Sequence, residues 1–439
     1  MSSRWDSGPW RTFRSLRHRN YRLLWFGATG HAASLWMDQV ARAVLILQMT
    51  DSALMLSLVI ATRLAPILLL GLIAGAITDR ADKRRLLLLT QCATAASYAI
   101  LGTLIVSGRI EVWHVFVTAV IAGTANAFSQ PVRQSLIPAT VPREDVLNAV
   151  ALRSSAVSFM RIGGGSIAGL LLIPFDVGGV YLINAGIYLA VIATTVMMQF
   201  PPVEQPGRVR GSIFGDLREG ISYVARNADL RIVVALAGIL YVLGLPYQQV
   251  FVPLLAIRTL DMGDSGVGFL AGASGAGAFT GSLVVAWKSD VERPGLQLMI
   301  NMLIFGSALV AVSLQATLIA TALLLATAGA MTVTYMTFTN GILLTHAPEE
   351  MHGRVMSLLS LDRGLIPLGS IMAGTLASTL GVRPGLFLMG AAVIVTSGTI
   401  LTFAGRRLAA IRRTPVEPPA IAAADRQARE PSGMLADQP

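Results

Sequence analysis

Long apolar segments recur along this chain of 439 residues, and each is long enough to cross a lipid bilayer as a helix. A helix needs about 20 apolar residues to span the hydrocarbon core. Segments of this kind lie at 23–48, 53–77, 86–107, 113–131, 147–173, 179–200, 230–256, 265–287, 296–314, 318–345, 354–379 and 384–405. The pattern predicts an all-α integral membrane protein with twelve transmembrane helices.

The composition fits a lipid environment better than water. Hydrophobic residues make up 54% of the chain and charged residues only 13%, whereas a soluble protein carries about 25% charged residues. The net charge of +10 would suggest nucleic acid as the partner of a soluble protein. Here the basic residues cluster at alternating ends of the apolar segments, which is the positive-inside pattern. We therefore expect a lipid bilayer and no nucleic acid as partner, with both termini in the cytoplasm.

Two short sequences repeat about 205 residues apart. Pro142-Arg143-Glu144 is echoed by Pro348-Glu349-Glu350, and Gly165-Ser166-Ile167-Ala168-Gly169 by Gly369-Ser370-Ile371-Met372-Ala373-Gly374. Repeated halves are typical of secondary transporters, so we expect two pseudo-symmetric six-helix bundles. The expected units are a cytoplasmic tail at 1–20, an N-terminal bundle at 21–200, a linker with an amphipathic helix at 201–229, a C-terminal bundle at 230–406 and a disordered cytoplasmic tail at 407–439.

Glycine pairs four residues apart occur in several segments, among them Gly165 with Gly169 and Gly268 with Gly272. Residues four apart share one face of a helix, and glycine lets another backbone approach that face closely. These pairs predict tight helix packing. In a transporter the same faces would let helices slide past one another.

The loop after the second apolar segment has the most distinctive sequence, Gly75-Ala76-Ile77-Thr78-Asp79-Arg80-Ala81-Asp82-Lys83-Arg84-Arg85. It resembles the signature loop of the major facilitator superfamily, Gly-x-x-x-Asp-Arg-x-Gly-Arg-[Arg/Lys], with Asp82 at the second glycine. The likeness extends over almost the whole chain, toward the branch of enterobactin-exporter-like and macrolide-efflux-like proteins. The segments that carry it include Phe13-Arg14-Ser15-Leu16-Arg17, Gln130-Pro131-Val132-Arg133-Gln134, Asp216-Leu217-Arg218-Glu219-Gly220 and Gly353-Arg354-Val355-Met356-Ser357.

This resemblance implies a gate on the cytoplasmic side. In families with the loop, the acid at Asp79 lies near the start of the eleventh helix, where a negative charge is stabilised by about 0.3–1 kcal/mol. We expect Asp79 to hold the two halves together in one state, within a network that includes Arg133, Glu144 and Arg354. The gating residues implied are Gly75, Asp79, Arg80, Lys83, Arg84, Arg133 and Arg354.

Charged residues inside apolar segments are expensive in lipid and usually functional. Asp38 and Arg42 are four apart, so they share one helix face. We expect proton coupling at Asp38 or Asp362, with Asp38 preferred; structural ion pairing is the competing interpretation for each such residue. Candidates to line a substrate cavity are Gln39, Arg42, Arg63, Asn126, Arg161, Tyr241, Gln248 and Arg363.

Motifs of other protein classes are absent from the sequence. It holds no Walker loop, no nucleophile–base set and no histidines at metal-ligand spacing, and it has a single cysteine. We therefore expect no enzyme activity, no cofactor, no metal and no disulfide.

The resemblance implies a secondary active transporter that exports a small organic molecule, such as a drug, siderophore or secondary metabolite. It would work as a monomer by proton antiport with alternating access. The excess of arginine over lysine fits the plasma (inner) membrane of a bacterium with a GC-rich genome. One alternative is a proton-coupled uptake permease, because Gly164-Gly165 stands where antiporters carry Gly-Pro. A non-transporting membrane sensor is a second alternative, which the gating loop and the intramembrane charges disfavour.

Overall fold

The computed structural model of this protein describes residues 8–199, 213–287, 291, 293–346 and 364–410, except for the side chains of 8–11, 72–73, 75–76, 79–80, 213–218, 220 and 410. Helices account for nearly all of this part of the chain, and it contains no strand. The N-terminal half comprises η1 (Gly8–Arg17), α1 (Arg19–Thr50), α2 (Ala53–Arg80), α3 (Lys83–Val106), α4 (Val112–Thr140), η2 (Arg143–Asp145) and α5 (Val146–Met197). The rest comprises α6 (Ile213–Arg226), α7 (Ala228–Ile239), η3 (Leu240–Gly244), η4 (Tyr247–Phe251), α8 (Val252–Leu254), η5 (Leu255–Thr259), α9 (Gly263–Trp287), α10 (Pro294–Leu314), α11 (Leu318–His346), α13 (Ile366–Thr379) and α14 (Val382–Ala410).

Nine helical stretches among the described residues are long and apolar enough to cross a membrane. One of them, α5, makes two crossings because its backbone turns at Asp176, where φ is 49°. The Asp176 carboxylate accepts hydrogen bonds from the backbone N–H groups of Gly178 (2.9 Å) and Gly179 (3.2 Å), and so caps the second half of α5. Helices α1 and α13 supply the other two of the twelve predicted crossings. Helix α1 carries several charged residues, and α13 is the described part of the segment at 354–379.

Two predicted segments differ in detail from the structure. The segment predicted to end at 131 continues as α4 to Thr140, through Pro131 and Pro138. Neighbouring helices inside a membrane protein satisfy the backbone groups that a proline frees, so proline does not end the helix there. The segment predicted as a uniform helix at 230–256 contains the π-helical turns η3, η4 and η5. At the end of η3, the backbone N–H of Leu245 donates to the carbonyl oxygen of Leu240, five residues earlier, as in a π-helix. The next residue is Pro246.

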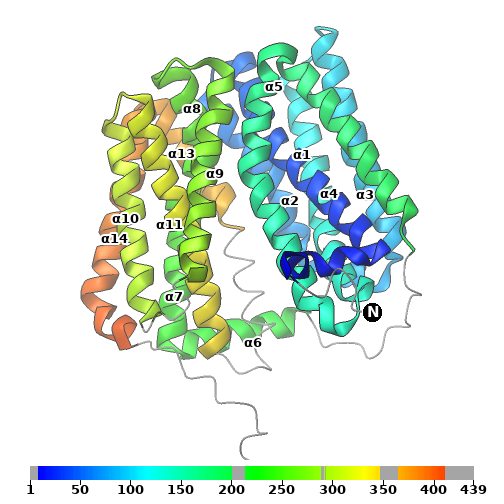
Figure 1. The fold of residues 1–439 in the computed structure, drawn as a ribbon. Helices are drawn as coiled ribbons and strands as arrows, with labels where there is room; N and C mark the ends of the chain where they lie inside the picture. Colours follow the sequence, from blue (N-terminus) through cyan, green and yellow to red (C-terminus); the bar gives the residue numbers. More distant parts are fainter. Residues whose placement is uncertain (1–7, 200–212, 288–290, 292, 347–363, 411–439) are drawn as a thin grey trace, which may run out of the picture.

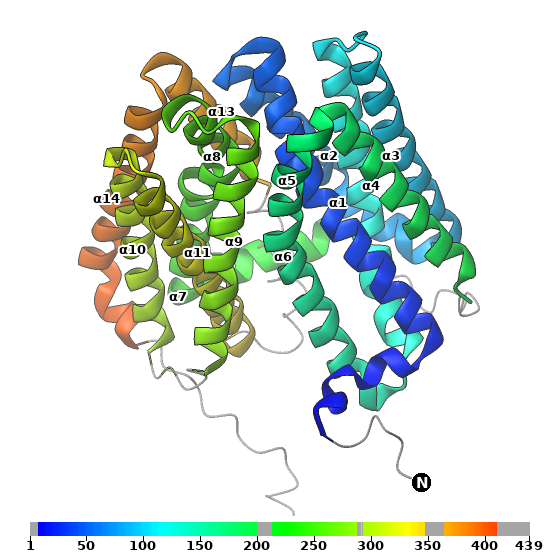
Figure 2. The same ribbon diagram turned by 45° about the horizontal axis from the view of Figure 1, so that its top comes forward.

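The helices form two bundles that stand side by side (Figures 1 and 2). In one bundle α1 and α3 pack on α5, and α2 packs on α4; in the other, α9 packs on α11 and α10 packs on α14. The bundles meet where α5 packs on α9 and α2 packs on α13. Helix α6 lies across the lower end in Figure 1, the end at which α1 begins and α14 ends.

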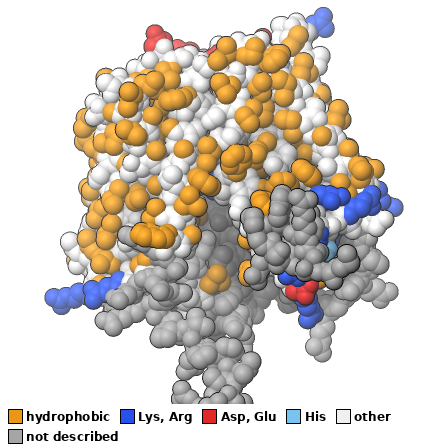
Figure 3. Space-filling model, viewed as in Figure 1, with side chains coloured by type: hydrophobic (Ala, Val, Ile, Leu, Met, Phe, Trp, Pro, Cys, Tyr) orange, Lys and Arg blue, Asp and Glu red, His pale blue; other side chains and the backbone are white. Residues whose placement is uncertain are grey.

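The outer surface of the described helices is apolar. Hydrophobic side chains cover most of the face drawn in Figure 3, while most lysine and arginine side chains in that view lie toward the lower end. Large apolar side chains such as Leu69 (71% exposed) and Phe403 (88% exposed) project outward. Water would solvate such a surface poorly, whereas hydrocarbon tails cover it at no cost, which is the physical reason that this chain is a multi-pass membrane protein.

Glycines allow the two bundles to touch along α5 and α9. A Cβ atom added at Gly169 would lie 2.8 Å from both the Gly268 Cα atom and the Ser265 carbonyl oxygen. A Cβ atom at Gly268 would in turn lie 2.6 Å from the Gly165 carbonyl oxygen. The backbones are therefore too close for any side chain, as the glycine pairs predicted.

We predict that Gly169→Val will destabilise the protein by about 1–3 kcal/mol, the usual range for forcing atoms into a packed site. The matched control is Gly186→Val on the same helix, because nothing lies within 4 Å of a Cβ atom at Gly186. Thermal unfolding of both variants in detergent, followed by size-exclusion chromatography, measures the difference. Equal melting temperatures for the two variants would contradict the close α5–α9 contact.

Candidate functional site

A buried ion cluster lies midway along α1. Asp38 is fully buried, and its Oδ1 atom accepts hydrogen bonds from Arg42 Nη2 (2.9 Å), Arg42 Nε (3.2 Å) and the Tyr181 hydroxyl (3.2 Å). Arg63 of α2 approaches the other oxygen, with Nη2 at 3.3 Å from Oδ2. Two guanidinium groups thus face one carboxylate.

The cluster also connects four helices of the N-terminal bundle. The Arg42 Nη1 atom donates to the Val115 carbonyl oxygen (3.0 Å) and to the Thr118 hydroxyl (3.1 Å) on α4. Asp38 and Arg42 come from α1, Arg63 from α2 and Tyr181 from the second half of α5. A buried ion pair stabilises a protein only when its remaining polar atoms are also satisfied, and removing one partner typically costs about 3–5 kcal/mol. The cluster therefore holds these helices in register.

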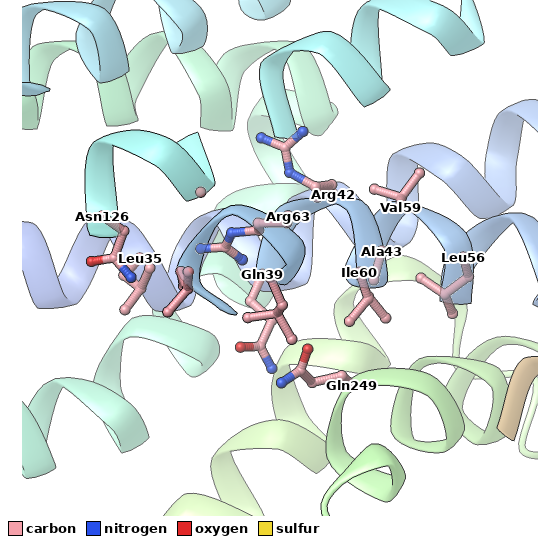
Figure 4. A pocket seen from close by; sticks show the side chains of 13 residues that line it. Leu35, Gln39, Arg42, Ala43, Leu56, Val59, Ile60, Arg63, Asn126 and Gln249 are labelled. Atoms are coloured by element: carbon pink, nitrogen blue, oxygen red, sulfur yellow. The ribbon is translucent and has the colours of Figure 1, made fainter. Parts of the chain in front are cut away.

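A cavity of about 190 Å³ opens beside this cluster (Figure 4). Four of the predicted cavity residues line it together, namely Gln39, Arg42, Arg63 and Asn126. The remaining lining residues include the apolar Leu56, Val59, Ile60, Leu64 and Ile67. Gln249 reaches the cavity from η4 of the other bundle, so the cavity lies between the bundles.

Sequence reasoning selected Gln248 and missed its neighbour Gln249. The two glutamines are adjacent in the chain, and a regular helix would place them 100° apart. The π-helical turns around them add residues to each turn and change which one faces the cavity. The only available signal was the pair of prolines, Pro246 and Pro253, which indicate an irregular helix but not its register.

Three other predicted cavity residues lie elsewhere in the described structure. Arg161 is close to Tyr247 at the contact between α5 and the second bundle, and the Tyr247 hydroxyl is 2.7 Å from the Ser274 hydroxyl of α9. Tyr241 is buried in the second bundle, and Gln248 is half-buried beside Gln249. None of the three lines the cavity of about 190 Å³.

A second, smaller cavity of about 10 Å³ adjoins the first. The two share Leu35, Arg63 and Asn126 in their walls. Arg133 of α4 and Tyr188 of α5 also line the smaller cavity. The Tyr188 hydroxyl is 2.6 Å from Nδ1 of His31, a residue that sequence reasoning did not select.

This position changes the interpretation of Arg133. The sequence placed it with Glu144 in one cytoplasmic network, but in the structure Arg133 is 3% exposed and lies beside Tyr188 within the bundle. Glu144 instead forms an ion pair with Arg14 of η1 (2.9 Å). The reason is that α4 continues past Pro131, so that Arg133 lies on a membrane helix rather than in a loop.

The signature loop is only partly described. The side chains of Gly75, Asp79 and Arg80 lie outside the described part, as do all atoms of Arg354, Asp362 and Arg363. The departure at Asp82 has a local explanation, because its carboxylate accepts hydrogen bonds from the backbone N–H groups of Arg84 (2.9 Å) and Arg85 (3.2 Å). Asp82 therefore caps α3, which begins at Lys83.

Arg84, a predicted gating residue, connects two helices at the lower end. Its guanidinium donates to the Val196 carbonyl oxygen at the end of α5 (3.0 Å). A second set of contacts fastens η1 to the start of α5. There Asp145, which is 1% exposed, lies 2.8 Å from Arg14 Nε, 3.1 Å from Arg17 Nη2 and 2.8 Å from His18 Nε2.

Polar contacts join the two bundles at the upper end in Figure 1, the end at which α1 finishes and α9 begins. Asp51, at the end of α1, forms an ion pair with Arg258 of η5 (2.7 Å), and the Gln48 amide donates to the Asp264 carboxylate of α9 (2.6 Å). The Asp51 side chain is 86% exposed. An ion pair of this exposure contributes only about 0.2–1 kcal/mol, so the closure is easily reversed.

We predict that Asp51→Asn will open this end part of the time. A pair of engineered cysteines, Gln48→Cys with Asp264→Cys in a Cys92→Ser background, should react with a short bis-thiosulfonate reagent. We expect Asp51→Asn to lower the ratio of closed to open forms by about two- to fivefold, as the loss of about 0.5–1 kcal/mol implies, and to slow that cross-linking in proportion to the lost closed fraction.

The matched control for this test is Arg109→Gln. Arg109 is an exposed arginine near the same end of the molecule, and its loss should leave cross-linking unchanged. An equal effect of both substitutions would mean that general surface charge, and not the Asp51–Arg258 pair, governs closure.

Two helical bundles with a cavity between them that carries polar groups from both are the architecture typical of membrane transporters with repeated halves. A POT family transporter in complex with 5-aminolevulinic acid has the same fold, with a TM-score of 0.71 at 12% identity over 88% of this chain and 96% of that one. This likeness confirms the predicted fold, two bundles of membrane helices.

The sequence model of the transmembrane secretion effector family, a branch of the major facilitator superfamily, matches residues 10–435, and the chain belongs to this family. It is 26% identical to the staphyloferrin A transporter of Staphylococcus aureus, over 85% of this chain and 93% of that protein. It is 24% identical to the multidrug efflux pump Tap of Mycolicibacterium fortuitum, over 88% and 95% of the two chains. Macrolide efflux protein A of Streptococcus pyogenes is 21% identical, over 86% and 95%. The predicted branch of the superfamily is thereby confirmed.

Proposed function

We propose that this protein exports a small organic molecule from the cell by alternating access. The observation that carries the proposal is the cavity of about 190 Å³ between the two bundles, which both bundles line with polar groups. Weak contacts such as Asp51 with Arg258 join the bundles at the upper end of the molecule. The names of the relatives, a multidrug efflux pump and a macrolide efflux protein among them, support export over uptake. In this proposal the protein works as a monomer in the bacterial plasma membrane, with both termini in the cytoplasm.

The proposed working units are the bundles at 21–200 and 230–406, joined by the linker at 201–229 and flanked by the tails at 1–20 and 407–439. Each bundle moves as a body about the α5–α9 and α2–α13 contacts. When the upper end opens, the lower end must close. We assign the lower closure to the signature loop, with Gly75, Asp79 and Arg80 acting together with Lys83, Arg84 and Arg354.

We further propose that export is coupled to proton entry, with Asp38 as the proton carrier and Asp362 as the second candidate. Asp38 supports this role because it is a fully buried carboxylate beside the cavity. Two guanidinium groups face it in this structure, with Arg42 Nη2 at 2.9 Å and Arg63 Nη2 at 3.3 Å. In this proposal Arg63 of α2 moves away from Asp38 during the transport cycle, and a proton takes its place on the carboxylate.

We predict that Asp38→Asn will abolish export driven by a pH gradient. The measurement uses purified protein in liposomes with an imposed pH gradient and a fluorescent pH indicator inside. The candidate cargo probes are of either charge, namely erythromycin, ethidium and indole-3-acetate. Cargo-dependent proton movement is expected for the unaltered protein and absent for the variant, while cargo exchange without a gradient persists. The direction of cargo movement separates export from proton-coupled uptake, and unchanged pH dependence in the variant would remove Asp38 from the mechanism.

The control for the Asp38 test is Asp261→Asn. Asp261 is exposed and has a φ of 49°, which asparagine tolerates well. This substitution also removes one negative charge, so normal coupling is expected.

We predict that Asp79→Asn will abolish transport while expression and cargo binding remain, because the substitution removes the charge proposed to hold the lower end closed. Asp82→Asn is its control, three residues away, since asparagine also caps a helix. The measurement is flux together with binding of the same probes. Full flux in Asp79→Asn would contradict the proposed gate.

A further inference from the structure

The polar interior of the N-terminal bundle carries an excess of positive charge. His31 lies within electrostatic reach of three guanidinium groups, those of Arg63, Arg133 and Arg153. Among the described residues that line the two cavities there is no carboxylate, and Asp38 contacts Arg42 and Arg63 of the larger cavity. Because Asp38 is already shared between Arg42 and Arg63, it cannot also neutralise Arg133.

Arg133 is the most deeply buried of these three guanidinium groups. Only 3% of the residue is exposed, and its Nη1 atom has no hydrogen-bond partner within the described part of the chain. It forms a side-chain hydrogen bond with the neutral Tyr188, and the like charge of Arg153 lies at longer range. A buried guanidinium without a counter-ion is costly in a membrane protein, and such groups mark ligand or ion pathways. The described residues offer this guanidinium group no anion.

The two cavities together can hold one ligand that has a small polar group at one end and a larger apolar body. The smaller, with about 10 Å³ between Arg63 and Arg133, has space for one water-sized group. The larger, with about 190 Å³, offers apolar side chains such as Leu56, Ile60 and Ile67 together with the amides of Gln39 and Asn126. Since the two share Arg63 and Asn126, one molecule can extend across both.

We propose that the cargo is an amphipathic organic anion, whose carboxylate binds between Arg63 and Arg133 while its apolar body occupies the larger cavity. This inference rests on the proposed function and names the chemical class of cargo for the same site. Two guanidinium groups recognise a carboxylate with charge and with paired N–H donors, which a neutral or cationic drug cannot match. Arg133 is the anion's first partner because no carboxylate among the described residues pairs with it.

Arg63 then acts as a shared partner. In the structure it lies 3.3 Å from Asp38, and it also lines both cavities. A cargo carboxylate that draws Arg63 toward Arg133 leaves Asp38 with Arg42 alone. Asp38 is therefore a positioning residue for cargo, because its charge holds Arg63 while the cavity is empty. Cargo and proton act on the same ion pair.

The test compares carboxylates with their uncharged amides. The probes are indole-3-acetate against indole-3-acetamide and salicylate against salicylamide, titrated by calorimetry into the purified full-length protein in detergent. We expect each carboxylate to bind at least about tenfold more tightly than its amide, the discrimination expected when about 1.4 kcal/mol comes from the charged contact. We expect Arg133→Gln and Arg63→Gln each to remove that difference, and Arg133→Lys to retain part of it.

The control variant is Arg109→Gln, which removes an exposed arginine that lines neither cavity and should keep the full preference. Arg133→Gln should melt at no lower a temperature than the unaltered protein, because it removes an uncompensated buried cation, and this excludes misfolding as the cause of lost binding. Equal affinity for carboxylate and amide, or an Arg133→Gln variant that keeps the preference, would overturn the inference.

Transport measurements distinguish this inference from the proposed function. If erythromycin or ethidium is exported and the carboxylates neither bind nor compete, the anion site is wrong while export stands. If the carboxylates bind through Arg133 and no probe of any charge crosses the liposome membrane, the anion site stands and export is wrong.

Discussion

The ion cluster around Asp38 is the interaction on which the rest of this structure depends. A carboxylate and two guanidinium groups lie inside a bundle whose outer surface is apolar, and each would be prohibitively costly there alone. Their mutual contacts, with Tyr181, Val115 and Thr118, join α1, α2, α4 and α5 into one unit. The same contacts leave net positive charge beside the cavity, so the feature that stabilises the bundle also determines what the cavity can attract.

The contacts between the two bundles have the opposite character. They consist of glycine faces on α5 and α9, where backbones touch without side chains, and of exposed polar pairs such as Asp51 with Arg258. Glycine faces slide at little energetic cost, and an ion pair in water is worth about 0.2–1 kcal/mol. Strong polar contacts within a bundle and weak contacts between bundles are the arrangement that rigid-body alternating access requires.

Particular residues show how far sequence reasoning could go. The apolar segments predicted the helices because a backbone in lipid must satisfy its own hydrogen bonds, which leaves helices as the only choice for such runs. The four-residue spacing placed Asp38 and Arg42 on one face, and Gln39, Arg63 and Asn126 were selected as polar groups in apolar segments. The structure brings four of these to one cavity. The roles of the signature loop, of Asp362 and of Arg363 depend on residues outside the described part.

Other positions could not be derived from local sequence. Whether Gln248 or Gln249 faces the cavity depends on π-helical turns, and whether Arg133 lies in a loop or in the membrane depends on how α4 passes Pro131. Both are decided by packing against neighbouring helices.

Length, hydrophobicity, charge asymmetry and internal repetition by themselves determined a twelve-helix membrane protein in two halves. Each of these properties can be determined from a single segment or from the comparison of two similar segments, so no contact between distant residues needs to be known. Only the tertiary structure decided that Arg63 serves both Asp38 and the cavity, that Arg133 meets no counter-ion among the described residues, and that the halves touch at the upper end. Those facts depend on which side chains from distant segments meet. The hydrophobic pattern of the sequence requires only that the outer face of each helix be apolar, so it does not determine these contacts.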